Sequence, residues 1–212
     1  MKQVPDVYAE PTSGPFSDLY ELGGEVYAWE VERSSQIDSG TVGERDYVFD
    51  LLGKMFADGD SSVFRRVGWH PIDRLGFLGS WYDPCRKALI YNGQIRNWNG
   101  RKFLRPTFAK YASIRLRSGA SATPPLGTSD FSYTVANPPY GYGENMGKVS
   151  DVFDTTLQYI FPSDDVRIMN FCSTELEALE WFKPGASWWG MYLWVLLGPG
   201  SRTLVIAAAA TD

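Results

Sequence analysis

An Asn-Pro-Pro-Tyr tetrapeptide, Asn137 to Tyr140, directly follows the apolar run 131–136 and carries groups suited to holding an aromatic amine. The amide oxygen of Asn137 and the backbone carbonyl of Pro138 can accept both N–H groups of an exocyclic amine on a base. Such contacts localise the nitrogen lone pair and stabilise charge that develops only in the transition state. Proline fixes φ and holds the carbonyl in place, and Tyr140 offers a flat face for a flipped base. The alternative is a proline-rich turn that closes a strand.

The cationic residues gather in the middle of the chain. Between Arg65 and Arg117 there are twelve Lys or Arg residues and two acids, a net charge of +10, whereas residues 1–64 carry −9 and residues 118–212 carry −6. Aromatic residues are interleaved with these cations, as single-stranded nucleic acid requires for contact with phosphates and bases. The alternative is a basic face neutralised by acidic segments, either of this chain or of a protein partner or second copy. We expect nucleic acid, RNA above all, to contact Arg96, Arg101, Lys102, Arg105, Lys110, Arg115 and Arg117.

Length and composition predict a single globular domain over residues 1–212. No apolar run approaches the roughly 18 residues of a membrane helix, so no membrane segment is expected. The first residues form no apolar signal region, and the two cysteines, Cys85 and Cys172, form no disulfide framework. A cytoplasmic location follows as an expectation. The single histidine, His70, disfavours a His/Cys zinc site, and we expect no metal.

The first half of the chain is predicted to contain one long helix among short strands. Residues 25–32 alternate in polarity as a half-buried strand does, and residues 63–69 form a shorter strand candidate. Thr41 and Glu44 fit a capping box that opens a helix ending near Phe56. Further strands are expected at residues 88–91 and 112–117, with hairpin turns at Asn92-Gly93 and Asn99-Gly100.

The last third is predicted to run strand, loop, helix, strand, helix and terminal hairpin. Thr174 and Glu177 fit a second capping box, and Gly198-Pro199-Gly200-Ser201 separates the hairpin strands. The expected elements are a strand at residues 131–136, a helix at 149–160, a strand at 166–171, a helix from 174 to about 182, and strands at 191–197 and 203–209.

This order of elements resembles the second half of the class I S-adenosylmethionine-dependent methyltransferase fold, over about residues 131–212. The resemblance implies an α/β domain with a Rossmann-like sheet and a C-terminal antiparallel hairpin. Together with the Asn-Pro-Pro-Tyr loop, it implies methyl transfer from S-adenosylmethionine to a base of nucleic acid, with Asn137, Pro138 and Tyr140 as catalytic residues. The alternative fold is a mainly β sandwich or jelly roll.

In such a fold the loop that binds the methyl donor follows the first core strand, some way before the catalytic loop. The segment 67–81 has this position, and its glycines would let the backbone approach a donor. The resemblance therefore implies that Trp69, Gly76, Gly79 and Ser80 hold S-adenosylmethionine. The acidic start and dense glycines usual in that family are not matched here.

A narrower resemblance, in element order and spacing over residues 45–81 and 166–212, is to the cap ribose methyltransferases of nidovirus-type RNA viruses. It implies a viral protein. That family works through a Lys-Asp-Lys-Glu tetrad, and the corresponding positions here are Arg45, Asn137, Met169 and Arg202. None of these four residues is the one that the tetrad has at that position. Without a lysine of tunable pKa, ribose hydroxyl activation is not expected.

Two other classes remain open. A non-enzymatic coat or scaffold protein that binds nucleic acid through its basic aromatic segment would account for the hairpin signals and the glycine and proline content. Phe171-Cys172-Ser173-Thr174 resembles the Ser-Thr-Ser element of ADP-ribosyltransferases, but no Glu-x-Glu follows it. A Ser-Thr pair before a helix more often caps that helix.

Overall fold

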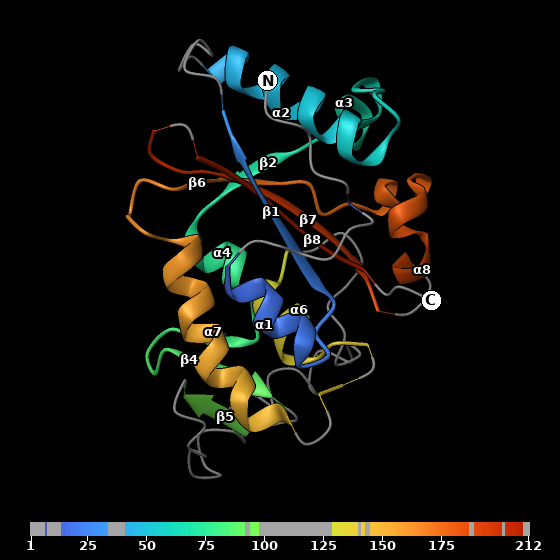
Figure 1. Ribbon diagram of the computed structural model, residues 1–212. Helices are drawn as coiled ribbons and strands as arrows, with labels where there is room; N and C mark the ends of the chain where they lie inside the picture. The colour runs from blue at the N-terminus through green and yellow to red at the C-terminus, as the bar shows by residue number, and fades with distance from the viewer. Residues whose placement is uncertain are drawn as a thin grey trace.

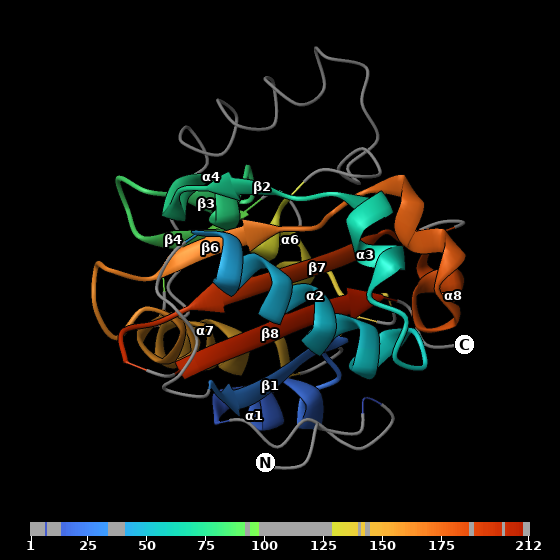
Figure 2. The same cartoon turned by 90° about the horizontal axis from the view of Figure 1, so that it is seen from above.

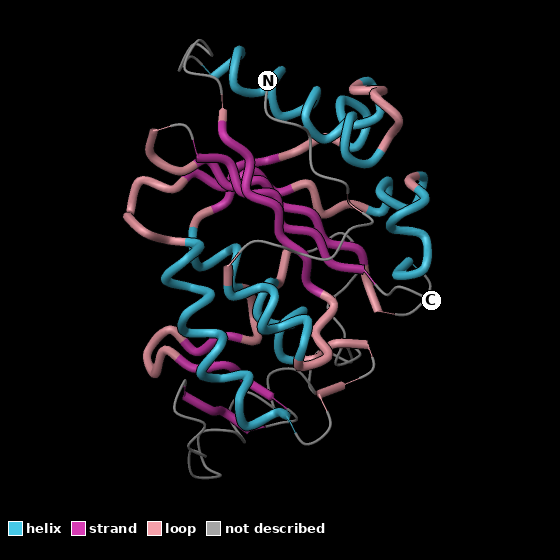
Figure 3. The backbone as a smooth tube through the Cα atoms, viewed as in Figure 1, coloured by secondary structure: helices cyan, strands magenta, loops and turns pink. Residues whose placement is uncertain are grey.

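The computed structural model describes residues 7, 14–33, 41–91, 94–97, 129–139, 141–142, 145–186, 189–200 and 202–209. A five-stranded sheet forms its centre, with the strand order β1-β8-β7-β6-β2. Every pairing in this sheet is antiparallel. Figure 3 shows its strands crossing the molecule with helices on both sides. The strands are β1 (Val26–Glu32), β2 (His70–Ile72), β6 (Arg167–Asn170), β7 (Met191–Leu197) and β8 (Arg202–Ala209).

The hairpin of β7 and β8 occupies the middle of this sheet and is apolar on both faces. All seven residues of β7 are buried, as are seven of the eight in β8. Because side chains alternate across a strand, Trp194 and Ile206 face one side of the sheet while Leu193 and Val205 face the other. The hairpin therefore needs apolar cover on both sides.

Helices supply that cover on each face (Figure 1). On the face of Trp194, an aromatic cluster joins Phe77 of α4 and Phe131 of α6, whose rings stack 4.6 Å apart. On the face of Leu193, Phe56 of α2 packs against Trp181 and Phe182. The first layer contains α1 (Pro15–Glu21), α4 (Arg74–Leu78), α6 (Phe131–Ala136) and α7 (Met146–Ile160); the second contains α2 (Thr41–Phe56), α3 (Ser62–Val67), the 3₁₀ helices η2 (Thr174–Ala178) and η3 (Glu180–Phe182), and α8 (Lys183–Ala186).

A second, smaller antiparallel sheet has the strand order β3-β4-β5. Its strands are β3 (Tyr82–Asp83), β4 (Ala88–Tyr91) and β5 (Gln94–Asn97). Buried Leu89 attaches it to the cluster around α6. Figure 2 shows the hairpin β7–β8 crossing between the two helical layers. Within the described residues, no helix is both long and apolar enough to cross a membrane.

The mixed α/β class and the C-terminal antiparallel hairpin are confirmed, and the mainly β alternative is wrong for the described residues. The described sheet is not the parallel sheet of a Rossmann-like methyltransferase, since each of its pairings is antiparallel. The predicted strand 25–32, the helix 41–56, the helix that ends at Ile160 and the strand 166–171 are confirmed to within a few residues. Residues 112–117 and both Asn-Gly turns lie outside the described residues.

Two predicted strands are helices. Residues 63–69 fall largely in α3, and residues 131–136 form α6. A short continuous apolar run fits a buried helix as well as a buried strand, and all six residues of α6 are buried. The carboxylate of Asp130 caps α6, since its Oδ1 accepts the N–H of Tyr133 at 3.0 Å, and this cap stabilises the helix. The predicted helix 174–182 is two 3₁₀ helices, and Ser173 caps the first by accepting the N–H of Glu175.

The position of Asp130 also explains why residue 79, in the 67–81 segment, is a glycine. Gly79 has φ +74°, and a Cβ built there would lie 2.4 Å from the carboxyl carbon of Asp130. Gly59 has φ +91° and open space around its Cβ position. Alanine at Gly59 should cost about 1–2 kcal/mol of backbone strain. Alanine at Gly79 should cost about 1–3 kcal/mol more, because Asp130 must move.

Chemical denaturation of Gly79→Ala and Gly59→Ala, side by side, measures this difference in the free energy of unfolding. Equal losses for the two variants would show that close approach to Asp130 is not the reason for Gly79.

Candidate functional site

The Asn-Pro-Pro loop ends helix α6 and uses its carbonyl groups within the protein. The backbone carbonyl of Asn137 accepts the indole N–H of Trp189 at 2.7 Å. The carbonyl of buried Pro138, expected to accept a target amine, accepts the N–H of Gly141 at 3.1 Å in a turn. Tyr140 lies outside the described residues. The geometry fits the turn alternative, and the catalytic role of these residues stays a prediction.

The four residues predicted to hold S-adenosylmethionine do not converge. Trp69 packs against the cluster on the α2 face of the sheet, whereas α4, which contains Gly76, belongs to the opposite face. The N–H of Gly76 donates to Asp73 Oδ1 at 2.6 Å, a cap of α4. Ser80 donates to Asp130 Oδ2 through both its N–H and its hydroxyl, at 2.9 and 2.7 Å. These contacts give the segment a structural role, and donor binding stays a prediction.

Of the residues predicted to contact nucleic acid, only Arg96 falls in the described part of the chain, where its backbone belongs to β5. Arg101, Lys102, Arg105, Lys110, Arg115 and Arg117 lie outside it. At the start of the same basic segment, Arg65 and Arg66 are exposed on α3. Arg65 pairs with Asp46 at 2.9 Å, while Arg66 donates to the hydroxyl of Ser62 at 3.3 Å.

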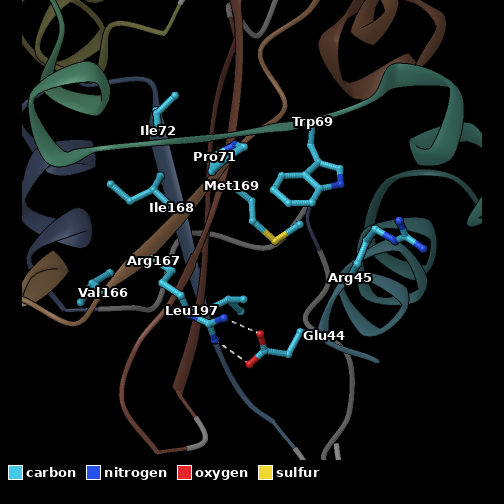
Figure 4. Close-up of a pocket in the computed structure, with 10 residues that line it drawn as sticks. All are labelled: Glu44, Arg45, Trp69, Pro71, Ile72, Val166, Arg167, Ile168, Met169 and Leu197. Carbon is cyan, nitrogen blue, oxygen red and sulfur yellow. Dashed lines mark hydrogen bonds and ion pairs between the residues drawn. The ribbon is translucent and has the colours of Figure 1, made fainter. Parts of the chain in front are cut away.

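The described residues contain a cavity of about 370 Å³ where strands β2 and β6 meet the beginning of α2 (Figure 4). Its volume is at the small end of the range for ligand pockets. Trp69 and Met169 form an apolar wall, and Arg45 and Glu44 come from α2. The complete lining is Glu44, Arg45, Trp69, Pro71, Ile72, Val166, Arg167, Ile168, Met169 and Leu197.

Glu44 is the buried acid of this pocket, with 3% of its surface exposed. Arg167 donates to both of its carboxylate oxygens at 2.6 Å, and Arg33 donates to Oε1 at 3.1 Å. The bonds from Arg167 lower the pKa of Glu44 from its ordinary value, against the opposing effect of burial. The pairing ties α2 to β6 across the mouth of the pocket, so both carboxylate oxygens are occupied.

Arg45 has no hydrogen-bond or ion-pair partner among the described residues, and its Nε is buried without an acceptor. Arg33 and Arg167 pair with Glu44, and with Arg45 counted the four charged side chains have a net charge of +2. A buried donor without a partner is costly. The pocket therefore favours a ligand that brings a negative charge to Arg45 and a flat or apolar group to Trp69.

Local sequence pattern gave no sign of this pocket. Glu44 fits a capping box, but it pairs with Arg167, which is 123 positions away in the chain. Arg45 and Met169, two positions compared with the ribose-methyltransferase tetrad, do line the pocket together. The other two lie elsewhere: Asn137 ends α6, and Arg202 donates to Glu30 while its guanidinium stacks on Tyr159.

No family model matches the chain, and neither a curated protein nor a solved structure was found to match it. No group of three or more His, Cys, Asp or Glu side chains among the described residues is arranged to hold a metal ion. His70 is exposed on β2, where its Nε2 lies 3.0 Å from the side-chain amide nitrogen of Asn170. Inference about function therefore depends on the pocket and on the distribution of charge.

Glu44→Gln should lower the free energy of unfolding at neutral pH by about 1.5–3 kcal/mol, the scale of hydrogen bonds to a charged group. The loss of stability should lie at the lower end of this range, because the Arg167 side chain is 56% exposed and solvent screens its charge. The pKa of Glu44 is lower in the folded protein than its ordinary value near 4.5, so this stabilisation is present above that value and is lost as pH falls through the lowered pKa.

Denaturation at pH values from about 7 down to 3 should thus show the gap between wild type and Glu44→Gln closing in acid. Asp50→Asn, which removes an exposed carboxylate from the same helix, is the control and should show a small gap at every pH. A gap that is constant or widens as pH falls would contradict the role assigned to Glu44.

Proposed function

We propose that the protein binds single-stranded nucleic acid, with RNA as the expected class, and that it acts by binding. The observation that carries this proposal is the pocket of Figure 4, in which the buried Nε of Arg45 has no acceptor within the described part of the chain and Trp69 forms a wall. Trp69 is also the fifth residue of the basic segment 65–117, whose net charge is +10. The pocket and the segment offer the same two kinds of contact, cations for phosphates and rings for bases.

Electrostatics favours a polyanion in spite of the acidic total charge of −5. A net charge concentrated in one stretch of chain attracts phosphates locally, and release of their counterions drives association. Arg65 and Arg66 are exposed on α3 and precede Trp69 in the chain; Arg65 is paired with Asp46, and Arg66 has no carboxylate partner among the described residues. The acidic residues are mostly outside this stretch, in residues 1–64 and 118–212.

The aromatic residues of the segment favour single strands over duplexes. Bases of a single strand are free to stack on protein rings, and each stack contributes roughly 1–3 kcal/mol. Trp69 is partly exposed and so accessible to a base. Binding without chemistry is also what a coat or scaffold protein would do, so the proposal is compatible with that class.

Methyl transfer from S-adenosylmethionine to a base is the alternative function, and it would make this binding protein an enzyme. It would need the Asn137 loop and the 67–81 segment to open, because Pro138, Gly76 and Ser80 use their polar groups within the protein. It would also need a donor site on an antiparallel sheet rather than on the Rossmann-like sheet that the resemblance implies. No interaction among the described residues favours it over binding alone.

Binding of a short single-stranded RNA should weaken steeply with salt. Each phosphate bound by a cation contributes about −0.7 to the slope of log affinity against log salt. Arg101→Ala combined with Lys102→Ala should therefore weaken binding and reduce the slope by about 0.7 for each phosphate that the variant no longer binds. Fluorescence anisotropy over a salt series measures both quantities.

Lys54→Ala combined with Lys148→Ala is the matched control, since it removes two exposed charges that lie outside the basic segment. It should leave the slope unchanged. If wild type does not bind RNA or DNA at about 50 mM salt, or if the two double variants behave alike, the proposed function is wrong.

A further inference from the structure

We infer that the pocket of Figure 4 is a subsite for one nucleoside monophosphate unit, with the phosphate on Arg45 and the base against Trp69 and Met169. This inference rests on the proposed function and names the part of the ligand that the described residues hold. The unit is either a nucleotide within a strand, including its terminal one, or a free mononucleotide.

The volume limits the ligand to one such unit. A cavity of about 370 Å³ is near the lower bound of about 300 Å³ for pockets that enclose small molecules. It is bounded by β2 and β6 on one side and by the first turn of α2 on the other. The ligand is therefore expected to insert a single base, while any longer strand continues over the exposed surface.

The phosphate assignment comes from the state of the charged groups. Glu44 is saturated by Arg167 and Arg33, so its charge is offset within the protein. Arg45 has no acceptor for its buried Nε–H among the described residues, and the planar guanidinium fork matches phosphate oxygens. An uncharged ligand would offer this side chain no charged acceptor, and a cationic ligand would be repelled by the local charge of +2.

The base assignment comes from the apolar wall. In Figure 4 the indole of Trp69 lies beside the thioether of Met169, while Arg45 comes from α2 and its guanidinium points away from both. An aromatic ring stacks on indole, and thioether sulfur contacts aromatic rings favourably. Because stacking is tolerant of base identity, we expect little preference among the four bases.

Calorimetric titration with adenosine monophosphate, adenosine, inorganic phosphate and S-adenosylmethionine tests this subsite. Adenosine monophosphate should bind at least about tenfold more tightly than adenosine, because only it supplies a charged acceptor to Arg45. Inorganic phosphate should bind more weakly than adenosine monophosphate because it has no base. S-adenosylmethionine should bind more weakly too, since it has no phosphate and carries a cationic sulfonium in its place.

Three variants locate the binding. Arg45→Gln should weaken adenosine monophosphate at least about tenfold and leave adenosine nearly unchanged, while Arg45→Lys should keep part of the affinity because it keeps the charge. Trp69→Leu should weaken both ligands. Arg66→Gln is the control and should change neither, since Arg66 is an exposed arginine outside the pocket lining. Thermal unfolding of each variant checks that the folded fractions match.

Equal affinity for adenosine monophosphate and adenosine, no effect of Arg45→Gln, or tighter binding of phosphate alone or of S-adenosylmethionine would each overturn the subsite. RNA binding that depends on Arg101 and Lys102, with no binding of adenosine monophosphate, would overturn the subsite and leave the proposed function standing. Binding of adenosine monophosphate without RNA binding that depends on Arg101 and Lys102 would overturn the proposed function and leave the subsite standing. Tighter binding of an RNA with a terminal phosphate than of the same RNA without it would place a strand end in the pocket. Equal affinity for these two RNAs, with competition by adenosine monophosphate, would place an internal nucleotide there. Both results support the subsite.

Discussion

The structure depends on one constraint, the complete burial of the central hairpin β7–β8. Its side chains are apolar on both faces of the sheet, so neither face can be left in water. Each helical layer exists to cover one face: α1, α4, α6 and α7 lie on the side of Trp194, and α2, α3 and the 3₁₀ helices lie on the side of Leu193. Rings rather than aliphatic chains fill much of the contact, as in the stack of Phe77 on Phe131.

The pocket lies at the edge of this sheet that is formed by the short strand β2. Strand β2 is only three residues long and contains Pro71, so it covers a short stretch of β6. Helix α2 approaches the same edge, where it is held by the paired Glu44 and Arg167. The cavity remains between these elements. The ion pair thus fixes the helix and occupies Glu44, so that among the described residues the neighbouring Arg45 has no acceptor for its Nε–H.

Much of the fold could be predicted from the sequence where burial is one-sided or where strands form a local hairpin. Helix α2 follows from periodicity and the hairpin at Gly198–Gly200 from its turn residues. The strand around Trp29 was predicted from alternation with Glu30 and Glu32, although its first four residues are buried on both faces of the sheet. Helix α6 could not, because all its residues are buried and the pattern has no period. Gly79 suggested a donor loop, yet its neighbour is Asp130, 51 positions later in the chain. The direction of the strands could not be predicted from local pattern either, because it is set by pairings between strands far apart in the sequence, such as β2 with β6. For the same reason, the pairing of Glu44 with Arg167 became visible only in the folded chain.

We propose that RNA contacts the pocket of Arg45 and Trp69 and not the Asn137 loop. Nitrogen–proton correlation NMR during titration with a short single-stranded RNA tests this most directly, because each N–H group gives its own signal. We predict that the indole N–H of Trp69 and the Nε–H of Arg45 shift with RNA concentration, while the side-chain amide of Asn137 and the backbone N–H of Ser80 do not. Shifts confined to Asn137 and Ser80, with Trp69 and Arg45 unchanged, would contradict it.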